Sequence, residues 1–309
     1  MMKPITNFEE LKKKAVELPS RKVSVVRADE AETMQAVRDA VRADMVEAVL
    51  VGPVNDIRRV AEEAGFDLNG IRVVDAADDH AAAAGAVDLV RRGEAQMLMK
   101  GLVATSVFMK AILDRDHGIR GDGLLSHVTV FDIPTYHKLL TVTDAAINIE
   151  PDFDQKVQIF RNALPVCGAL GIARPKCTYV CAKEVPYDRM PRTLEAQRMK
   201  EMADAGEFGD ILFDAPLAMD LAVSMEAVRI KKIESEVAGD ADLLLVPDIE
   251  SGNILYKTLI FLANAELGAV VMGATNPVVL TSRADSAESK LCSLVLSGIV
   301  AGYTGGAGK

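Results

Sequence analysis

The sequence predicts an α/β protein built from mainly parallel sheets with helices on both faces. Short apolar runs alternate with longer stretches of helical period along the whole chain, which is typical of successive strand and helix units. The early apolar runs are almost continuously hydrophobic, as expected for parallel strands that are covered on both sides. The chain has 309 residues, of which 50% are hydrophobic, and this length suggests two domains.

The first part of the chain predicts four parallel strands with helices between them. Pro53 suits the first turn of a helix, and Gly65 and Gly93 stand where helices are expected to end. The expected strands span residues 22–27, 46–51, 71–74 and 95–99, and helices are expected at residues 31–42 and 53–64.

The second part of the chain begins with two strand candidates, residues 125–131 and 139–146. Because only a few residues separate them, we expect an antiparallel or mixed element and not a parallel crossover. Helices are then expected at residues 152–170, 192–205 and 222–237, strands at 178–182, 211–213, 243–246, 269–272 and 278–281, and a last helix from Ser286. The glycine-rich segment 118–123 marks a domain boundary near residue 121.

The chain is acidic, with a net charge of −10 at pH 7. Long-range repulsion therefore disfavours binding to nucleic acid or to an anionic membrane surface.

The N-terminal residues contain no apolar core of signal-peptide length, so we expect a cytoplasmic protein. The uncharged stretch 291–308 contains five glycines, which favours a buried C-terminal helix with a loose tail over a membrane span. The four cysteines lack metal-ligand spacing and are expected to be reduced, packed thiols.

Four segments place a strand end, a small loop and a helix start in succession, a geometry that offers backbone N–H groups to an anion. In the first, Lys100 supplies a charge, Thr105 and Ser106 supply hydroxyls, and Lys110 follows about one turn later. An ordinary helix cap with a surface lysine explains this segment equally well.

The second and third segments lie in the middle of the chain. Ser126 and His127 open one strand, and Asp144 and Asn148 close the next; a histidine at a strand end is more often structural than catalytic. In the third segment Asp248 begins a loop that ends at Gly252 and Asn253, where a long helix is expected to start. Gly252 would let the backbone approach a phosphate closely, whereas Ser251 or Asn253 as a simple helix cap is the alternative.

The fourth segment carries Ser282 and Arg283 between a strand and a helix, where the arginine can bind an anion with two hydrogen bonds. Asp285 and Glu288 have the spacing of a capping box, so Glu288 also has a purely structural interpretation. The nicotinamide fingerprint GxGxxG, the GxSxG elbow and HExxH are missing from the sequence, and the C-terminal GGAGK lacks the first glycine of a P-loop.

The order and spacing of these segments are more specific than any one of them. The most specific block is Pro247-Asp248, then Gly252-Asn253, then Tyr256-Lys257, supported by residues 144–148 and by Pro277-Val278 followed by Ser282-Arg283. In this arrangement the chain resembles the phosphate acetyl/butyryl transferase family. The resemblance implies a two-domain α/β fold similar to that of isocitrate and isopropylmalate dehydrogenases, with the active site in the cleft and a homodimer as the usual form. The first domain would then be discontinuous, residues 1–121 plus 270–309, with residues 122–269 as the second.

The resemblance also implies the reaction, in which an acyl-CoA and phosphate are interconverted with an acyl phosphate and CoA. Ser282 and Arg283 match the family's active-site pair, and Lys110 falls near a phosphate-binding arginine of acetyl-specific members. Those members place an aspartate seven residues after the serine, where this chain has Ser289, so the adjacent Glu288 is the expected general base. Asp144 and Asp248 are the reserves for that role.

The chemistry that we expect is direct attack of the CoA thiolate on the acyl phosphate, with no metal and with no cofactor beyond coenzyme A as a substrate. A carboxylate near the thiol raises the reactive fraction, and Arg283 with helix-start N–H groups would stabilise the oxyanion. The residues expected to bind acyl-CoA, phosphate or acyl phosphate are Lys100, Thr105, Ser106, Lys110, Ser126, Asp144, Asn148, Asp248, Gly252 and Asn253.

The acyl group is expected to be butyryl, because residues 100–103 and 126–134 look more like the butyryl branch of the family. Three alternatives stay open: acetyl transfer by the same mechanism, a metal- and NAD-dependent decarboxylating dehydrogenase on the same fold, and a non-catalytic protein that binds CoA or acyl phosphate. The dehydrogenase requires clustered aspartates that the sequence does not offer at helical spacing. The non-catalytic alternative is motivated by Ser289.

Overall fold

The computed structural model describes residues 3–282 and 285–306, and it divides into two compact units. Unit 1 contains Met1–Asn7 and Leu124–Leu267, and unit 2 contains Phe8–Gly123 and Gly268–Lys309. We expected boundaries near residues 121 and 269. In the structure the first boundary follows Gly123 and the second follows Leu267, each two residues from the expected position. The N-terminal segment is a correction: it belongs to unit 1, where the Ile5 N–H donates to the Leu170 carbonyl at 2.9 Å.

The sheet of unit 2 has a parallel core, as the apolar runs predict. Its strand order is β3-β2-β1-β4-β11-β10, and only the β10–β11 pair is antiparallel. The apolar residues of β1 and β4 are buried, which accounts for the continuous hydrophobicity of these runs. The strands are β1 (Arg21–Val26), β2 (Val46–Gly52), β3 (Arg72–Asp75), β4 (Met97–Lys100), β10 (Glu266–Met272) and β11 (Val278–Val279).

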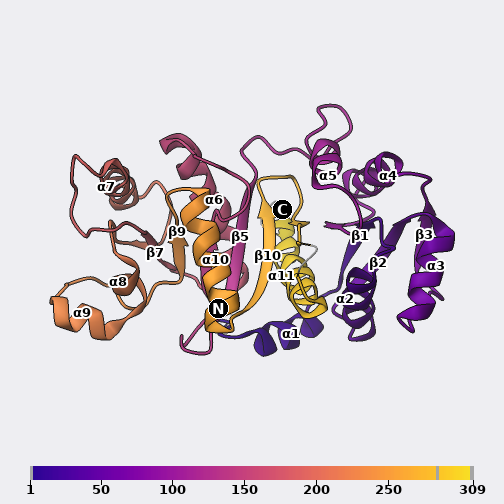
Figure 1. The fold of residues 1–309 in the computed structure, drawn as a ribbon, viewed down its shortest axis with the longest axis horizontal. Coiled ribbons are helices and arrows are strands. Elements are labelled where there is room, and N and C mark those ends of the chain that lie inside the picture. The colour runs from indigo at the N-terminus through magenta and orange to yellow at the C-terminus, as the bar shows by residue number, and fades with distance from the viewer. Residues whose placement is uncertain (1–2, 283–284, 307–309) are drawn as a thin grey trace. The chain divides into compact units, whose positions relative to one another are not determined.

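Helices cover both faces of this sheet (Figure 1). The α4 helix packs on β1, β2 and β4 and contacts α5, whereas α11 packs on β1, β4 and β11 and contacts α1 and α2. The α11 helix extends to Gly306, so the glycines that favour a tail are helical up to that residue; the end of the expected tail lies outside the described residues. The helices are α1 (Phe8–Glu17), α2 (Ala31–Arg42), α3 (Val54–Glu63), α4 (Asp79–Arg91), α5 (Thr105–Ile112) and α11 (Ala287–Gly306).

Unit 1 is a second α/β unit with strand order β5-β6-β9-β7-β8. The β5–β6 pair is antiparallel, with Val128 opposite Thr143, as their closeness in sequence predicts, and the other pairs are parallel. The strands are β5 (Ser126–Asp132), β6 (Leu140–Thr143), β7 (Lys176–Tyr179), β8 (Leu212–Phe213) and β9 (Leu243–Leu245). Both units therefore confirm the predicted α/β class.

The helices of unit 1 begin at polar caps in most cases. Asp152 and Gln155 form a capping box at the start of α6, and Pro191 opens α7. The single helix expected at residues 222–237 is wrong: Ser224 ends one short helix and caps a second, and Lys232 ends the second in the left-handed conformation. The helices are α6 (Phe153–Ala169), α7 (Pro191–Asp204), α8 (Met219–Val223), α9 (Met225–Lys231) and α10 (Ile249–Ala263).

The cysteines are free thiols, and most of them are buried. Cys167, Cys177 and Cys292 are buried and all four cysteines are free, in agreement with packed thiols. Across residues 3–282 and 285–306, we find no helix with the length and apolar character needed to cross a membrane.

Candidate active site

Two of the four predicted segments come together in unit 2. The strands β4 and β11 are parallel neighbours, with Val279 opposite Met99. Lys100 is the last residue of β4 and Ser282 follows β11 closely, so both lie at the carboxyl edge of this sheet. Open α/β sheets bind their ligands at this edge. The geometry therefore makes this edge the candidate site of unit 2.

Lys100 and Gly101 turn the chain sharply at the end of β4. The Lys100 side chain is buried, and its Nζ donates to the Gly101 carbonyl at 3.2 Å. A Cβ atom at position 101 would lie 2.2 Å from the Arg27 carbonyl oxygen, so only glycine fits against the end of β1. The charge of Lys100 is thus held close to the backbone at the sheet edge.

The first turn of α5 follows this turn with exposed polar side chains. Thr105 and Ser106 are exposed, and the N-cap residue Ala104 has no side chain that could accept from the first N–H groups. Lys110 is also exposed and lies in the last turn of the helix. The alternative of an ordinary helix cap does not hold, because no side chain caps α5, although Lys110 is a surface lysine. The start of α5 therefore offers backbone donors and two hydroxyls to an anion.

Arg27 is a cation at the same edge that the sequence analysis missed. It follows β1, a parallel neighbour of β4, and its carbonyl accepts from the Leu102 N–H at 2.8 Å. Its guanidinium binds both oxygens of Asp29 at 2.8 Å and also contacts Asp79, and the hydrogen bonds to Asp29 raise its pKa. A charged residue directly after an apolar run is the signal that could have identified it. Because its guanidinium is already bound to two carboxylates, Arg27 shapes this edge and offers little charge to a ligand.

Ser282 and Asp285 are tied to each other after β11. The Ser282 N–H donates to Asp285 Oδ2 at 2.7 Å, and the Asp285 N–H donates to the Ser282 carbonyl at 3.1 Å. Ser282 is exposed and Asp285 is half-buried. The predicted partner Arg283 lies outside the described residues. The pair of backbone bonds places a carboxylate beside the predicted active-site serine.

The start of α11 differs from the expected capping box. Ser286 is the cap, because its Oγ accepts from the Ser289 N–H at 3.2 Å. Glu288 instead forms an ion pair with Lys12 of α1, 2.5 Å from its Nζ, and the Glu288 side chain is 50% exposed. Burial lowers the pKa of Lys12, but the hydrogen bond to Glu288 and the charges of Cys292, Glu288 and Glu9 together outweigh it, and the pKa is raised. Glu288, the expected general base, therefore has its carboxylate directed to Lys12 of α1.

In unit 1, Asp144 organises the turn after β6. Its two oxygens accept from the N–H groups of Ala146, Ile147 and Asn148 at 2.9, 3.1 and 3.2 Å. The Asn148 Nδ2 also donates to Asp144 at 2.6 Å and to the Leu125 carbonyl at 2.8 Å. Asp144 is 4% exposed, so this carboxylate holds a turn and its lone pairs are occupied.

Ser126 and His127 at the start of β5 are also buried. The Ser126 Oγ accepts from Asn162 Nδ2 of α6 at 2.9 Å, and Ser126 is 0% exposed. His127 Nδ1 lies 3.1 Å from the Thr129 hydroxyl. The bond from Asn162 joins β5 to α6, and the contact of His127 with Thr129 lies within β5, which agrees with the structural interpretation of His127.

The third segment begins its helix earlier than expected. Asp248 is the N-cap of α10, and its Oδ1 accepts from the Ser251 N–H at 2.9 Å and from the Ser251 hydroxyl. Burial raises the pKa of Asp248, but the bonds from Ser251 and the charges of Arg192 and Lys156 together outweigh it, and the pKa is lowered. Helix α10 therefore starts at Ile249, and the expected loop up to Gly252 and Asn253 is wrong.

Gly252 lies in the first turn of α10 against the turn that Asp144 organises. A Cβ atom here would lie 2.7 Å from the Asp144 carbonyl oxygen and 2.9 Å from Ala145 Cα. Asn253 Nδ2 donates to the Ala145 carbonyl at 3.3 Å. At Gly252 the backbone therefore makes a close approach to the Asp144 turn.

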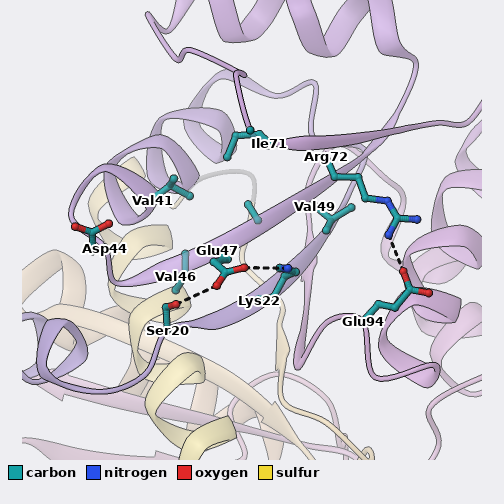
Figure 2. A pocket seen from close by; sticks show the side chains of 12 residues that line it. Ser20, Lys22, Val41, Asp44, Val46, Glu47, Val49, Ile71, Arg72 and Glu94 are labelled. Carbon is teal, nitrogen blue, oxygen red and sulfur yellow. Dashed lines mark hydrogen bonds and ion pairs between the residues drawn. The ribbon is translucent and has the colours of Figure 1, made fainter.

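The cavity drawn in Figure 2 is not at the candidate site. It has a volume of about 430 Å³ and lies in unit 2 at the amino ends of β1, β2 and β3. Four of its five charged side chains form ion pairs, Lys22 with Glu47 at 2.9 Å and Arg72 with Glu94 at 2.6 Å, and Asp44 is the fifth. Ligands of open α/β sheets bind at the opposite edge, where Lys100 and Ser282 lie.

In the part of the chain that the structure describes, no three His, Cys, Asp or Glu side chains are grouped so that they could hold a metal ion.

Comparison with known proteins identifies the family. The family described as "Phosphate acetyl/butaryl transferase" matches residues 80–297, a span that contains every site residue predicted from the sequence. A phosphate butyryltransferase of Clostridium acetobutylicum is 40% identical over 298 residues, covering 96% of this chain and 99% of that protein. The chain belongs to the phosphate acetyl/butyryl transferase family. It is therefore an acyltransferase, as the order of its motifs predicts.

Other members of the family support this placement. A phosphate acetyltransferase of Rhizobium meliloti is 41% identical over 263 residues, covering 85% of this chain and 83% of that protein. A branched-chain phosphotransacylase from Enterococcus faecalis superposes with a TM-score of 0.80 and 33% identity over 91% of this chain and 99% of the other. The 4-hydroxythreonine-4-phosphate dehydrogenase of Klebsiella pneumoniae, at 11% identity and TM-score 0.59 over 91% of this chain and 99% of its own, shares the fold. The predicted dehydrogenase-like fold of this family member is confirmed.

Proposed function

We propose that this phosphate acyltransferase acts on a four-carbon acyl group and interconverts butyryl-CoA plus phosphate with butyryl phosphate plus CoA. The observation that carries the proposal is the coverage of the butyryl relative, which matches 96% of this chain and 99% of its own length. Acetyl transfer by the same mechanism is the second candidate, favoured by the 41% identity to an acetyltransferase. One methylene in an apolar pocket discriminates by only ~1–3 kcal/mol, so turnover of both acyl groups is expected.

The phosphate group is assigned to the carboxyl edge of unit 2. The uncapped first turn of α5 offers backbone N–H groups, with Thr105 and Ser106 as further donors. The ammonium groups of Lys100 and Lys110 supply positive charge from the adjoining strand and helix. A helix N-terminus with nearby lysines is a suitable environment for phosphate.

The chemical step is one displacement at the acyl carbon. The thiolate sulfur of CoA attacks the carbonyl carbon of the acyl phosphate, the carbon–oxygen bond to phosphate breaks, and phosphate leaves with that electron pair. The thiol proton passes to a carboxylate, and Ser282 and Arg283 are assigned to the developing oxyanion. No covalent acyl-enzyme, metal or further cofactor takes part in the proposed step.

We assign the general base to Asp285 and not to the expected Glu288. Asp285 is hydrogen-bonded to the backbone of Ser282, whereas the Glu288 carboxylate is paired with Lys12. The two reserves fit less well, since Asp144 holds its own turn and Asp248 caps α10. Ser126, Asn148, Gly252 and Asn253 are assigned to maintaining unit 1, because their contacts are made within it.

We propose that the functional form is a cytoplasmic homodimer. The outward face of α10 is apolar, with Ile254 68%, Phe261 71% and Leu262 80% exposed. Around Thr258 this pattern reads nearly the same in both directions, so two copies of the helix can pack antiparallel about a two-fold axis. Residues 258–265 carry no charge that would oppose the contact.

Light scattering tests the dimer. The wild-type chain should have the mass of two copies, and Leu262→Glu should reduce it to one. The matched control is Ile230→Glu on α9, a residue that is 73% exposed and should leave the mass unchanged. A monomeric wild-type protein would exclude the homodimer.

The activity is tested by release of CoA thiol from acetyl-, propionyl-, butyryl- and isobutyryl-CoA, with and without phosphate, in the presence of a chelator. We expect phosphate-dependent release that persists with chelator and is fastest at four carbons. The Ser282→Ala variant should be folded and slower by roughly a hundredfold or more. A maximum at acetyl-CoA would favour the second candidate, and no release from any substrate would refute the proposed activity.

A further inference from the structure

Lys290 is a buried lysine of α11 to which the proposed reaction assigns no part. It is 1% exposed, and its side chain runs toward the segment that carries Ser282. Its Nζ donates to the Ser282 carbonyl at 3.1 Å and to the Asp285 carbonyl at 3.3 Å. The same Nζ lies 3.8 Å from Glu30 Oε2.

The surroundings of this ammonium explain how it can be buried. An ammonium group has three donors, and burying it is unfavourable unless they are satisfied. Here two backbone carbonyls accept hydrogen bonds from the ammonium, and the Glu30 carboxylate at 3.8 Å adds an opposite charge. A well-packed apolar side chain often stabilises a fold as much as a buried ion pair does, so stability alone does not require a lysine here.

Glu30 gives the ammonium a fixed anchor. It is the N-cap residue of α2, and its Oε2 also accepts from the hydroxyl of Thr33, which is fully buried. The anchor therefore belongs to a helix that packs against α11, and not to the segment that Lys290 holds.

We propose that Lys290 is the positioning residue for Ser282. This inference rests on the proposed role of Ser282 in acyl transfer. Lys290 holds the Ser282 carbonyl while Asp285 Oδ2 holds the Ser282 N–H, so both polar backbone groups of the serine are fixed. The second bond of Lys290, to the Asp285 carbonyl, fixes the carboxylate that we assign as base. Lys290 itself contacts no reacting atom and acts through these two residues.

The test is Lys290→Met, which keeps the length and volume of the side chain and removes the ammonium. We expect kcat to fall roughly ten- to hundredfold, because small displacements of reacting groups have effects of this size. The KM values for butyryl-CoA and phosphate should stay within about twofold, since Lys290 does not touch either substrate. Hydrogen exchange of the Ser282 and Asp285 amides should become faster, while the rest of α11 stays protected.

Two further variants separate positioning from general destabilisation. Lys156→Met removes a lysine of unit 1 that is 0% exposed, and it should leave exchange at Ser282 and Asp285 as in the wild type. Glu30→Gln removes the charge of the anchor and should change exchange and kcat in the same direction as Lys290→Met but by less. If Lys290→Met does not fold, Glu30→Gln decides the question.

The exchange measurement does not depend on the activity. A wild-type protein without transacylase activity would refute the proposed function, yet exchange would still show whether Lys290 holds the segment. Wild-type exchange at Ser282 and Asp285 in folded Lys290→Met would overturn the inference even if kcat fell. Faster exchange with unchanged kcat would equally overturn it.

Discussion

Two carboxylates after Ser282 differ in what they are bonded to. Asp285 accepts from the Ser282 N–H at 2.7 Å, whereas Glu288 pairs with Lys12 of α1 at 2.5 Å. The sequence places both within a few residues of the serine and cannot rank them, because the ranking depends on α1, more than 270 residues away. A carboxylate that acts as base must reach the proton, so the position of its partners decides its role.

We predict that Asp285→Asn lowers the activity, whereas Glu288→Gln lowers only the stability. Asp285→Asn should lower kcat by about a hundredfold or more, because a general base contributes about 10²- to 10⁴-fold. Glu288→Gln should keep kcat within about twofold and lower the thermal midpoint slightly, since it weakens a partly exposed ion pair. Steady-state kinetics with melting curves measure both. Full activity in Asp285→Asn together with a large loss in Glu288→Gln would restore Glu288 as the base.

At the scale of helices and strands, the sequence predicts best where burial enforces a single pattern. The α2 helix matches its expected range of residues 31–42, because its apolar spacing and its buried face agree. The start of α10 could not be predicted, because Asp248, Ser251 and Asn253 are all good caps. Asp248 becomes the cap where the first turn of α10 packs on the turn of Asp144, a tertiary contact that local sequence does not report.

The candidate site also has some features that the sequence predicts and others that depend on tertiary packing. From the sequence, Lys100 and Ser282 could each be placed between a strand end and a helix start, whereas their common edge depends on the pairing of β4 with β11. The sequence does not predict the hydrogen bond between Asn148 and Asp144 or the ion pair between Lys290 and Glu30. Each of these contacts joins residues whose distance depends on packing. Polar side chains near a predicted site look alike in sequence whether they bind a ligand or a neighbouring backbone.

Gly252→Ala tests the close contact between α10 and the Asp144 turn. The added methyl would lie 2.7 Å from a backbone oxygen, so the first turn of α10 must shift, and we expect a loss of about 1–3 kcal/mol in the free energy of unfolding. Gly305→Ala in α11 is the matched control, because a Cβ there meets nothing within 4 Å. It should be neutral or slightly stabilising, since alanine favours the helix. Urea unfolding compares the two, and equal stabilities would contradict this packing.

At the scale of the whole chain, the excess of acidic groups is partly offset by local cation clusters. In unit 1, Asp240 contacts Lys176 at 2.6 Å, Lys138 at 3.0 Å and His137 at 2.8 Å. Burial raises the pKa of Asp240, but the hydrogen bonds from Lys176, Lys138 and His137 and the charge of Lys138 together outweigh it and lower the pKa to about 2. Since this is below the ordinary value of 3.8, the charged carboxylate stabilises the fold above that value.

We therefore predict a pH-dependent effect of Asp240→Asn. The variant should unfold more easily than the wild type above pH ~4, and the difference should shrink as the pH falls toward ~2 and Asp240 is protonated in the folded state. Thermal midpoints across this range measure the difference. Asp204→Asn serves as control, because Asp204 is 64% exposed and 3.6 Å from Lys200. A difference between wild type and Asp240→Asn that does not change with pH would refute the assignment.

The most direct test of the central claim, that this chain transfers the acyl group between CoA and phosphate in one displacement, is isotope exchange. Radiolabelled inorganic phosphate is incubated with butyryl phosphate and the enzyme, with and without CoA, and label in butyryl phosphate is measured. We predict rapid incorporation with CoA and none without it, because the acyl group reaches phosphate only from butyryl-CoA. Incorporation without CoA would reveal a covalent acyl-enzyme, and no incorporation under either condition would contradict the transfer itself.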